Sequence, residues 1–222
     1  MKGKRKRNSK KQKNRMVIIH GPNQKTEQNY FKAFIQAMGD NRNSPVIPVM
    51  MSMKSNTCDP VKLVERAIEF LNTKSNQHVG SCWVLGDRDE NFDLQESIRL
   101  AKNYEKMVEG KQKIKVIWSN QAFEIWFIYH FQRLLRYKHR NDYAKELNTL
   151  FVKNNIGVDY KKSDEKHFWY LKDFISTAVD NAEFSYQSHI IKQGKNPNNA
   201  CSCTNVFELV KRLNLISQNK IF

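Results

Sequence analysis

Two aspartates follow the clearest strand candidate in the sequence, at a spacing that suits a hard divalent cation. Residues 81–85 form a short apolar run, and Asp87 and Asp89 come directly after it. In an extended chain, residues two apart point to the same side, so the two carboxylates would face the same way. Carboxylate oxygens suit Mg²⁺ or Mn²⁺, which often bridge to phosphate. The same pattern also occurs as a turn that caps a helix, and taken alone it leaves both interpretations open.

Two glutamates are predicted at the same end of the sheet. Glu124 follows the predicted strand 114–118, and Glu27 follows the apolar run 17–19. Ligands of open parallel sheets gather beyond the carboxyl ends of the strands, so we expect both glutamates near Asp87. Each could instead be an acid in the first turn of a helix, where it complements the helix dipole. Convergence of these carboxylates at one sheet edge is therefore the central prediction.

The charge of the chain favours a polyanionic partner. The formal net charge is +16 at pH 7, and the first fifteen residues hold nine lysines and arginines and no acid. A field of this sign attracts nucleic acid, the commonest polyanion in a cell. No apolar run is long enough to span a membrane, and the basic start lacks the apolar core of a signal peptide. We expect a cytoplasmic protein with nucleic acid, and no membrane, as its partner.

A second basic cluster is predicted at the end of an apolar helix that runs from residue 122 to about 135. Its members are Arg133, Arg136, Lys138, His139 and Arg140. They could hold a phosphate backbone close to the acidic residues. They could equally be solvated cations that complement the dipole at a helix end. The overall charge favours phosphate contact.

The elements that must position these residues alternate between strands and helices. Predicted strands cover 17–19, 46–51, 81–85 and 114–118, and Pro48 makes the second an edge strand. Such alternation predicts an α/β fold with a mostly parallel sheet flanked by helices. Strand signals fade after residue 141. Helices are predicted over 143–152, 168–184 and 205–216, the last with a capping box from Asn205 to Glu208.

These elements predict three parts of the chain. Residues 1–15 have no apolar periodicity and are expected to be a disordered basic arm. Residues 16–140 would form the α/β core, and 141–222 a helical C-terminal part packed on it. The four tryptophans suggest base stacking. Because Trp83 and Trp118 fall in predicted strands and Trp126 in an apolar helix, packing in the core is favoured instead.

Five short blocks, found in order, resemble the RloB-like family. They are 25–31 (KTEQNYF), 59–64 (DPVKLV), 87–89 (DRD), 119–126 (SNQAFEIW) and 204–206 (TNV). Together they extend over about residues 17–213. The resemblance implies a Toprim-like fold and a Mg²⁺-dependent nuclease linked to restriction and anti-phage defence (abortive infection), often encoded beside an AAA/ABC-type ATPase. It also implies that Asp87 and Asp89 hold the metal and that Glu124 is a third acidic residue of the site.

The sequence departs from the family pattern at the end of the first strand. The family has C-E-G there, and its glutamate is the expected general acid or base. This chain has His20 before Gly21 instead. His20 could exchange protons or bind metal in its place, or the nuclease chemistry is impaired. Glu27 is the nearest carboxylate, but it would have to reach back across a turn.

Two functions therefore follow from the sequence. The first is a metal-dependent nuclease acting on RNA or DNA with an ATPase partner. The alternative is a Toprim-like subunit that binds nucleic acid or a partner without cutting. The sequence leaves open the choice between RNA and DNA, the trigger and the oligomeric state, including a homo-oligomer.

Overall fold

The computed structural model describes residues 14–39, 44, 46–52, 58–88, 93–134, 136–200 and 202–217. Asp89 and residues 1–13 of the predicted basic arm lie outside the described residues. The last two residues assigned to that arm, Asn14 and Arg15, belong to the first strand.

A four-stranded parallel sheet forms the centre of the fold. Its strands are β1 (Asn14–His20), β2 (Val46–Ser52), β3 (Val79–Asp87) and β4 (Lys113–Ser119), in the order β2-β1-β3-β4. The predicted α/β class and parallel sheet are confirmed, and β2, with Pro48, is an edge strand. The chain goes to one side of β1 to make β2 and returns to its other side to make β3. The strand order therefore reverses between β1 and β3, where α/β sheets of this kind bind their ligands.

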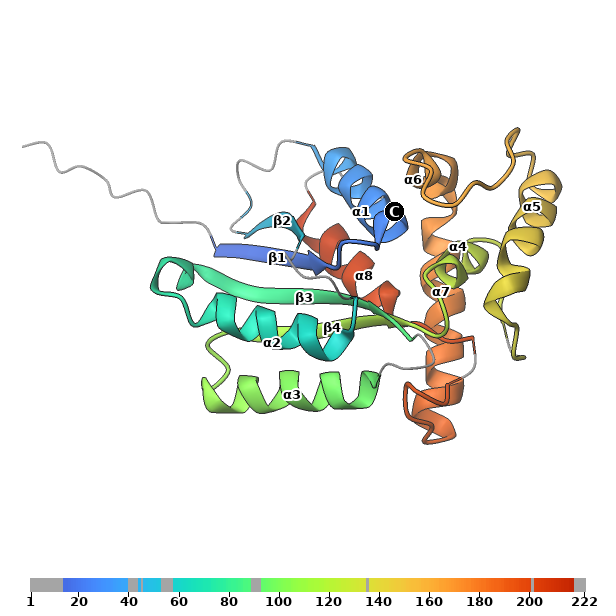
Figure 1. The fold of residues 1–222 in the computed structure, drawn as a ribbon. Coiled ribbons are helices and arrows are strands. Elements are labelled where there is room, and N and C mark those ends of the chain that lie inside the picture. Colours follow the sequence, from blue (N-terminus) through green and yellow to red (C-terminus); the bar gives the residue numbers. More distant parts are fainter. Residues whose placement is uncertain are drawn as a thin grey trace, which may run out of the picture.

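Helices cover both faces of the sheet (Figure 1). One face carries α1 (Lys25–Ala37) and α8 (Val206–Ile216), and the other carries α2 (Pro60–Leu71) and α3 (Leu94–Met107). Alternation along β1 explains the two layers: Met16 and Ile18 join the core beneath α1, and Val17 and Ile19 join the core beneath α2. With apolar groups on both faces, the strand is buried except at its first two residues.

Two helix boundaries are marked by local signals in the sequence. The Asp59 carboxylate accepts a hydrogen bond from the Val61 amide (2.9 Å), and Pro60 is the first residue of α2. After α1, Gly39 has φ of 72°, a left-handed conformation that glycine adopts without strain.

Further helices build much of the rest of the described chain. They are α4 (Glu124–Tyr129), α5 (Tyr143–Lys153), α6 (His167–Leu171) and α7 (Ile175–Tyr186). Single turns of 3₁₀-helix cover Lys74–Asn76, Arg140–Asp142 and Lys172–Phe174, and a π-helical turn, Gln187–Lys192, follows α7. The predicted helix from 122 to about 135 is wrong in length, because α4 ends at Tyr129. The predicted helix over 168–184 is interrupted by the 3₁₀ turn at Lys172–Phe174.

The outer edge of β4 is closed by the segment before α8. The Trp118 amide donates to Oδ1 of Asn205 (2.7 Å), and Nδ2 of Asn205 donates to the Val116 carbonyl (3.0 Å). The Thr204 hydroxyl donates to the Trp118 carbonyl (2.7 Å). The predicted capping box at Asn205 is therefore wrong, because this side chain bonds to β4 and not to α8.

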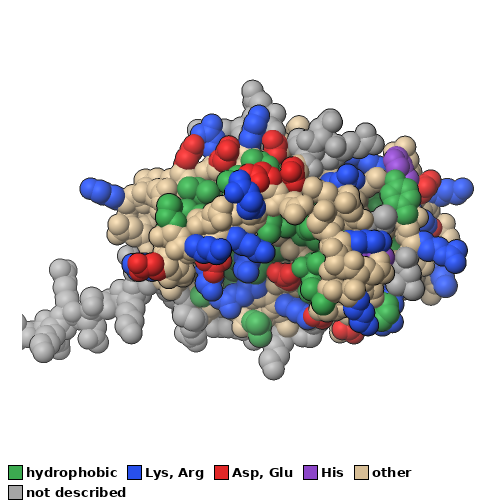
Figure 2. All heavy atoms as spheres, turned by 90° about the horizontal axis from the view of Figure 1, so that it is seen from below, with side chains coloured by type: hydrophobic (Ala, Val, Ile, Leu, Met, Phe, Trp, Pro, Cys, Tyr) green, Lys and Arg blue, Asp and Glu red, His purple; other side chains and the backbone are tan. Residues whose placement is uncertain are grey.

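The α2–α3 face, shown in Figure 2, carries basic and acidic side chains mixed together. Exposed pairs one helical turn apart account for part of this pattern: Arg66 with Glu69 on α2 (2.7 Å) and Arg99 with Glu96 on α3 (2.6 Å). In the described part of the chain, no helix has the length and apolar character needed to cross a membrane.

Candidate acidic site

Asp87 is the last residue of β3, at the point where the strand order reverses. It pairs with Ser119 of β4, and the Arg88 amide donates to the Ser119 carbonyl (2.9 Å), so the backbone pairing continues past it. The Asp87 side chain is half-buried and accepts a hydrogen bond from the Phe123 amide. The two family-like segments that carry Asp87 and Phe123 are therefore joined at the carboxyl end of the sheet.

Glu27 reaches Asp87 from the first turn of α1. Its side chain is only 5% exposed, and the two carboxyl groups share a hydrogen bond. Glu27 thus crosses the turn that separates it from the end of β1 and enters the site beside Asp87.

Glu124 completes the cluster, which we call the acidic site (Glu27, Asp87 and Glu124). It is the first residue of α4, is 8% exposed, and accepts a hydrogen bond from the Tyr160 hydroxyl at Oε1 (2.9 Å). Burial raises the pKa of both Glu27 and Asp87, and the negative charge of Glu124 raises both pKa values further. Of the carboxylates predicted to meet at this sheet edge, the structure brings Glu27, Asp87 and Glu124 together, and Asp89 lies outside the described residues.

An aromatic cluster beneath the acidic site holds its helices together. Tyr30 lies one turn after Glu27 in α1, and its ring meets those of Phe123, Phe127 and Phe168 at centroid distances of 5.8, 5.6 and 5.6 Å. Tyr30 is 1% exposed. The packing fixes α1 against α4 and α6. It therefore also fixes the position of Glu27 on α1 relative to Glu124 on α4.

His20 ends β1 at the same edge of the sheet and is 2% exposed. Its Nδ1 faces the Gly21 carbonyl at 2.9 Å and must carry the proton that makes this bond. Burial lowers the pKa of His20, and the nearby charge of Lys32 lowers it further. His20 is therefore a neutral imidazole near pH 7, with one nitrogen engaged by the backbone.

The donors of the acidic site fit a hard cation in kind, since all are carboxylates. Among the residues that the structure describes, no three His, Cys, Asp or Glu side chains form a ready-made metal-binding group. Asp89, the second predicted ligand, falls outside that part of the chain. The charge of Lys162 opposes the raised pKa of Glu27 only in part, and a divalent cation would supply further positive charge.

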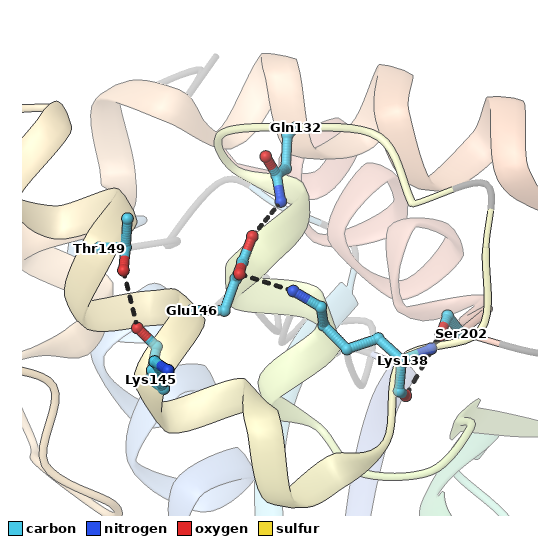
Figure 3. Close-up of polar contacts among 6 residues, drawn as sticks. All are labelled: Gln132, Lys138, Lys145, Glu146, Thr149 and Ser202. Carbon is cyan, nitrogen blue, oxygen red and sulfur yellow. Dashed lines mark hydrogen bonds and ion pairs between the residues drawn. The ribbon is translucent and has the colours of Figure 1, made fainter.

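The predicted basic cluster is not at a helix end, because it lies in the segment after α4. Arg133 and Arg136 are exposed, and the Arg133 guanidinium lies 4.2 Å from the Phe184 ring centroid and donates to Asn181 (3.2 Å). Lys138 forms an ion pair with Glu146 of α5 (2.6 Å), drawn in Figure 3. The backbone amide of exposed Arg140 donates to Gln121 (2.9 Å). Arg133 and Lys138, two of the residues predicted to contact phosphate, thus already bind side chains of the same chain.

Two residues beside the acidic site were not indicated by the sequence. Tyr160 bonds to Glu124, and His167 stacks on Tyr160 with ring centroids 5.0 Å apart. Both come from the C-terminal part, in a loop and a short helix with no recognisable motif. Contacts with α4 and α5 position Tyr160: its ring lies 6.4 Å from those of Phe127 and Phe151, and its amide donates to Asn148 (2.7 Å).

The family-like blocks have clear structural roles. Asn120 donates from Nδ2 to the Pro197 carbonyl (3.0 Å), and the Leu94 amide donates to Asn198 (3.0 Å), so the segment before α8 is tied to both β4 and α3.

The model of the family described as RloB-like protein matches residues 17–213. No curated protein and no solved structure matches the chain. The match extends from β1 into α8 and includes every residue of the acidic site, so the chain belongs to the RloB-like family.

Proposed function

We propose that this protein is a Toprim-type, metal-dependent nuclease that cuts phosphodiester bonds in RNA or DNA. The observation that carries the proposal is the meeting of Glu27, Asp87 and Glu124 where the strand order reverses. Buried like charges cost stability, and such clusters with shifted pKa values are characteristic of functional sites. The excess positive charge of the chain suits a polyanionic substrate.

Each residue of the acidic site has a distinct proposed role. Asp87, Asp89 and Glu124 would hold Mg²⁺ or Mn²⁺, which would polarise the phosphodiester and stabilise charge developing on it. Glu27 lies beside Asp87 with its pKa raised by burial to about 7, and it would be the carboxyl group best placed to give or take a proton. It would serve in place of the glutamate that the family carries at the end of its first strand. His20 is the second candidate for that role.

The surroundings of the site have supporting roles in the proposal. The basic arm and Arg133, Arg136, Lys138 and Arg140 would raise the local concentration of nucleic acid. Since the family resemblance implies defence systems with an AAA/ABC-type ATPase, we propose that the nuclease acts with such a partner against phage.

A non-cutting role is the second candidate, because the end of β1 carries His20 and no carboxylate. In that case the protein would bind nucleic acid or a partner subunit only. The two functions differ in one measurable product, a cut strand.

The test is cleavage of end-labelled tRNA, unstructured RNA, single-stranded DNA and duplex DNA by the full chain, with Mg²⁺, with Mn²⁺ and with EDTA. We expect cuts that need the metal and that disappear in Asp87→Asn. Glu69→Gln is the matched control, since it removes an exposed carboxylate from the opposite face of the sheet. Cleavage that survives in Asp87→Asn would place the chemistry elsewhere.

Metal binding is measured separately by calorimetry with MnCl₂. We expect heat of binding from the wild type and from Glu69→Gln, and none from Asp87→Asn. Binding of nucleic acid without cleavage, both alone and with any ATPase encoded beside it plus ATP, would support the non-cutting role.

A further inference from the structure

A groove separate from the basic cluster runs between α1 and α6. It encloses about 640 Å³. Its walls carry polar and charged side chains around one aromatic residue: Asn29, Lys32 and Gln36 from α1, and Glu165, Lys166 and Trp169 from the segment that includes α6. We call it the Trp169 groove.

Trp169 differs from the other tryptophans. It is 41% exposed, whereas Trp83, Trp118 and Trp126 are at most 9% exposed. The buried ring of Phe168 contacts it edge to face at 5.1 Å and packs against Phe34 in turn (5.3 Å). A large aromatic side chain is thus held in place by the core while much of it faces solvent, which is the arrangement of a stacking platform.

The charge of the groove suits an anion. Lys32 and Lys166 are both exposed, and neither forms an ion pair with another described residue within 4.0 Å. Glu165 is the acid that faces them. The lysines on the α2–α3 face lie among acids, but this groove keeps a net positive charge beside its aromatic residue.

The groove and the acidic site share α1. Lys32 follows Glu27 by five residues, which is about 7.5 Å along a helix axis. Asn29, between them, donates to the Ser163 carbonyl (2.8 Å) and so joins α1 to the segment leading into α6. A ligand lying along α1 would reach both places with a length of a few nucleotides.

We propose that the Trp169 groove binds single-stranded nucleic acid beside the acidic site, with a base stacked on Trp169 and phosphates against Lys32 and Lys166. The inference deepens the proposed function, from which it takes nucleic acid as the ligand. A paired base is already stacked inside a helix, so the groove selects unpaired strands. An acidic peptide is the competing occupant and is one arm of the test.

Binding is measured on the full chain in EDTA, where no cutting occurs, with labelled eight-nucleotide oligouridine and oligothymidine and with a blunt duplex. We expect one or both single strands to bind more tightly than the duplex, and the tighter of them identifies RNA or DNA as the source. Trp169→Ala weakens binding about 10-fold, and Trp169→Phe, which keeps a ring, restores most of it. Oligonucleotide also quenches tryptophan fluorescence in the wild type but not in Trp169→Phe.

The lysines are tested by salt dependence. Lys32→Glu and Lys166→Glu each reduce the slope of log K against log salt by roughly 0.7 for a single strand. Lys62→Glu makes the same charge change on the exposed side of α2 and leaves the slope close to that of the wild type.

Three results would overturn the inference: wild-type affinity in Trp169→Ala, equal weakening by Lys62→Glu, or quenching of Trp169 by oligoglutamate as strong as by oligouridine. These results are independent of cleavage. If Trp169→Ala binds with unchanged affinity and still cuts, the groove inference fails and the nuclease proposal stands. If binding depends on Trp169 but no cutting occurs, the groove inference stands and the nuclease proposal fails.

Discussion

The acidic site gathers carboxylates together, whereas the α2–α3 face pairs acids with bases. On the α2–α3 face, Arg66 pairs with Glu69 and Arg99 with Glu96, in contact with solvent. At the carboxyl end of the sheet, Glu27, Asp87 and Glu124 are gathered without a described cation in hydrogen-bond contact, and burial raises the pKa of both Glu27 and Asp87. Exposed pairs contribute little to stability, whereas buried like charges oppose folding. The fold tolerates the second arrangement where we propose that a metal and a phosphate bind.

The two regions also differ in the packing that supports their charged side chains. The α2–α3 pairs stand on the outside of amphipathic helices and can be removed without disturbing the core. The acidic site stands on the aromatic cluster around Tyr30, where a change in packing moves the carboxylates themselves.

The largest difference between the two regions is expected in catalysis. Glu27→Gln keeps the size of the side chain but removes the proton exchange, and should lower the cleavage rate by about 10²–10⁴-fold. Glu96→Gln on α3 should cleave at the wild-type rate. The measurement is single-turnover cleavage with saturating protein. An equal rate for Glu27→Gln would return the role to His20, which His20→Gln then tests.

Loss of the aromatic support comes next. Tyr30→Ala removes a side chain that is 1% exposed and should lower the free energy of unfolding by about 3–5 kcal/mol in urea titrations. Leu215→Ala, at a side chain 78% exposed, serves as the control and should change it little. A small loss in Tyr30→Ala would mean that the cluster does not position the two glutamates.

Acid should weaken the same interior. Burial lowers the pKa of His130 to about 3, and its Nδ1–H is held by the Trp126 carbonyl (2.9 Å). The unfolded chain binds a proton below pH 6.5 that the folded protein excludes, so stability present above that pH is lost as pH falls towards 3. We expect a loss of up to about 1.4 kcal/mol per pH unit. His130→Gln should flatten this slope in urea titrations between pH 6.5 and 4, and an unchanged slope would contradict the assignment.

The smallest effect concerns the charges of the site. Asp87→Asn removes one of the crowded carboxylates and should raise Tm in EDTA by about 2–4 °C, even though it abolishes activity. Glu69→Gln, which removes a paired acid, should not raise it. A fall in Tm for Asp87→Asn would show that the acidic site is stabilising without metal.

Much of the framework could be predicted from the sequence because its signals are local. Apolar runs marked all four strands, and the pattern around Pro48 indicated the edge position of β2. The placement of Glu27, Asp87 and Glu124 followed from a general property of parallel sheets, which brings the carboxyl ends of strands together.

The remainder depended on contacts between distant segments. The end of α4 at Tyr129 has no glycine, proline or capping signal, since the apolar residues continue through the turn that follows. Asn205 has the residue type of a helix cap but bonds to β4, and no local pattern distinguishes the two uses. Tyr160 reaches Glu124 across 36 positions of sequence, and nothing in its own segment indicates that partner.

The Asn205 side chain also limits how the protein can associate. By bonding to the amide of Trp118 and the carbonyl of Val116, it acts as a one-residue substitute for a neighbouring strand. A β-strand from another molecule would need these same groups and cannot pair with the second half of β4. The full-length edge that remains for a subunit to extend the sheet is that of β2.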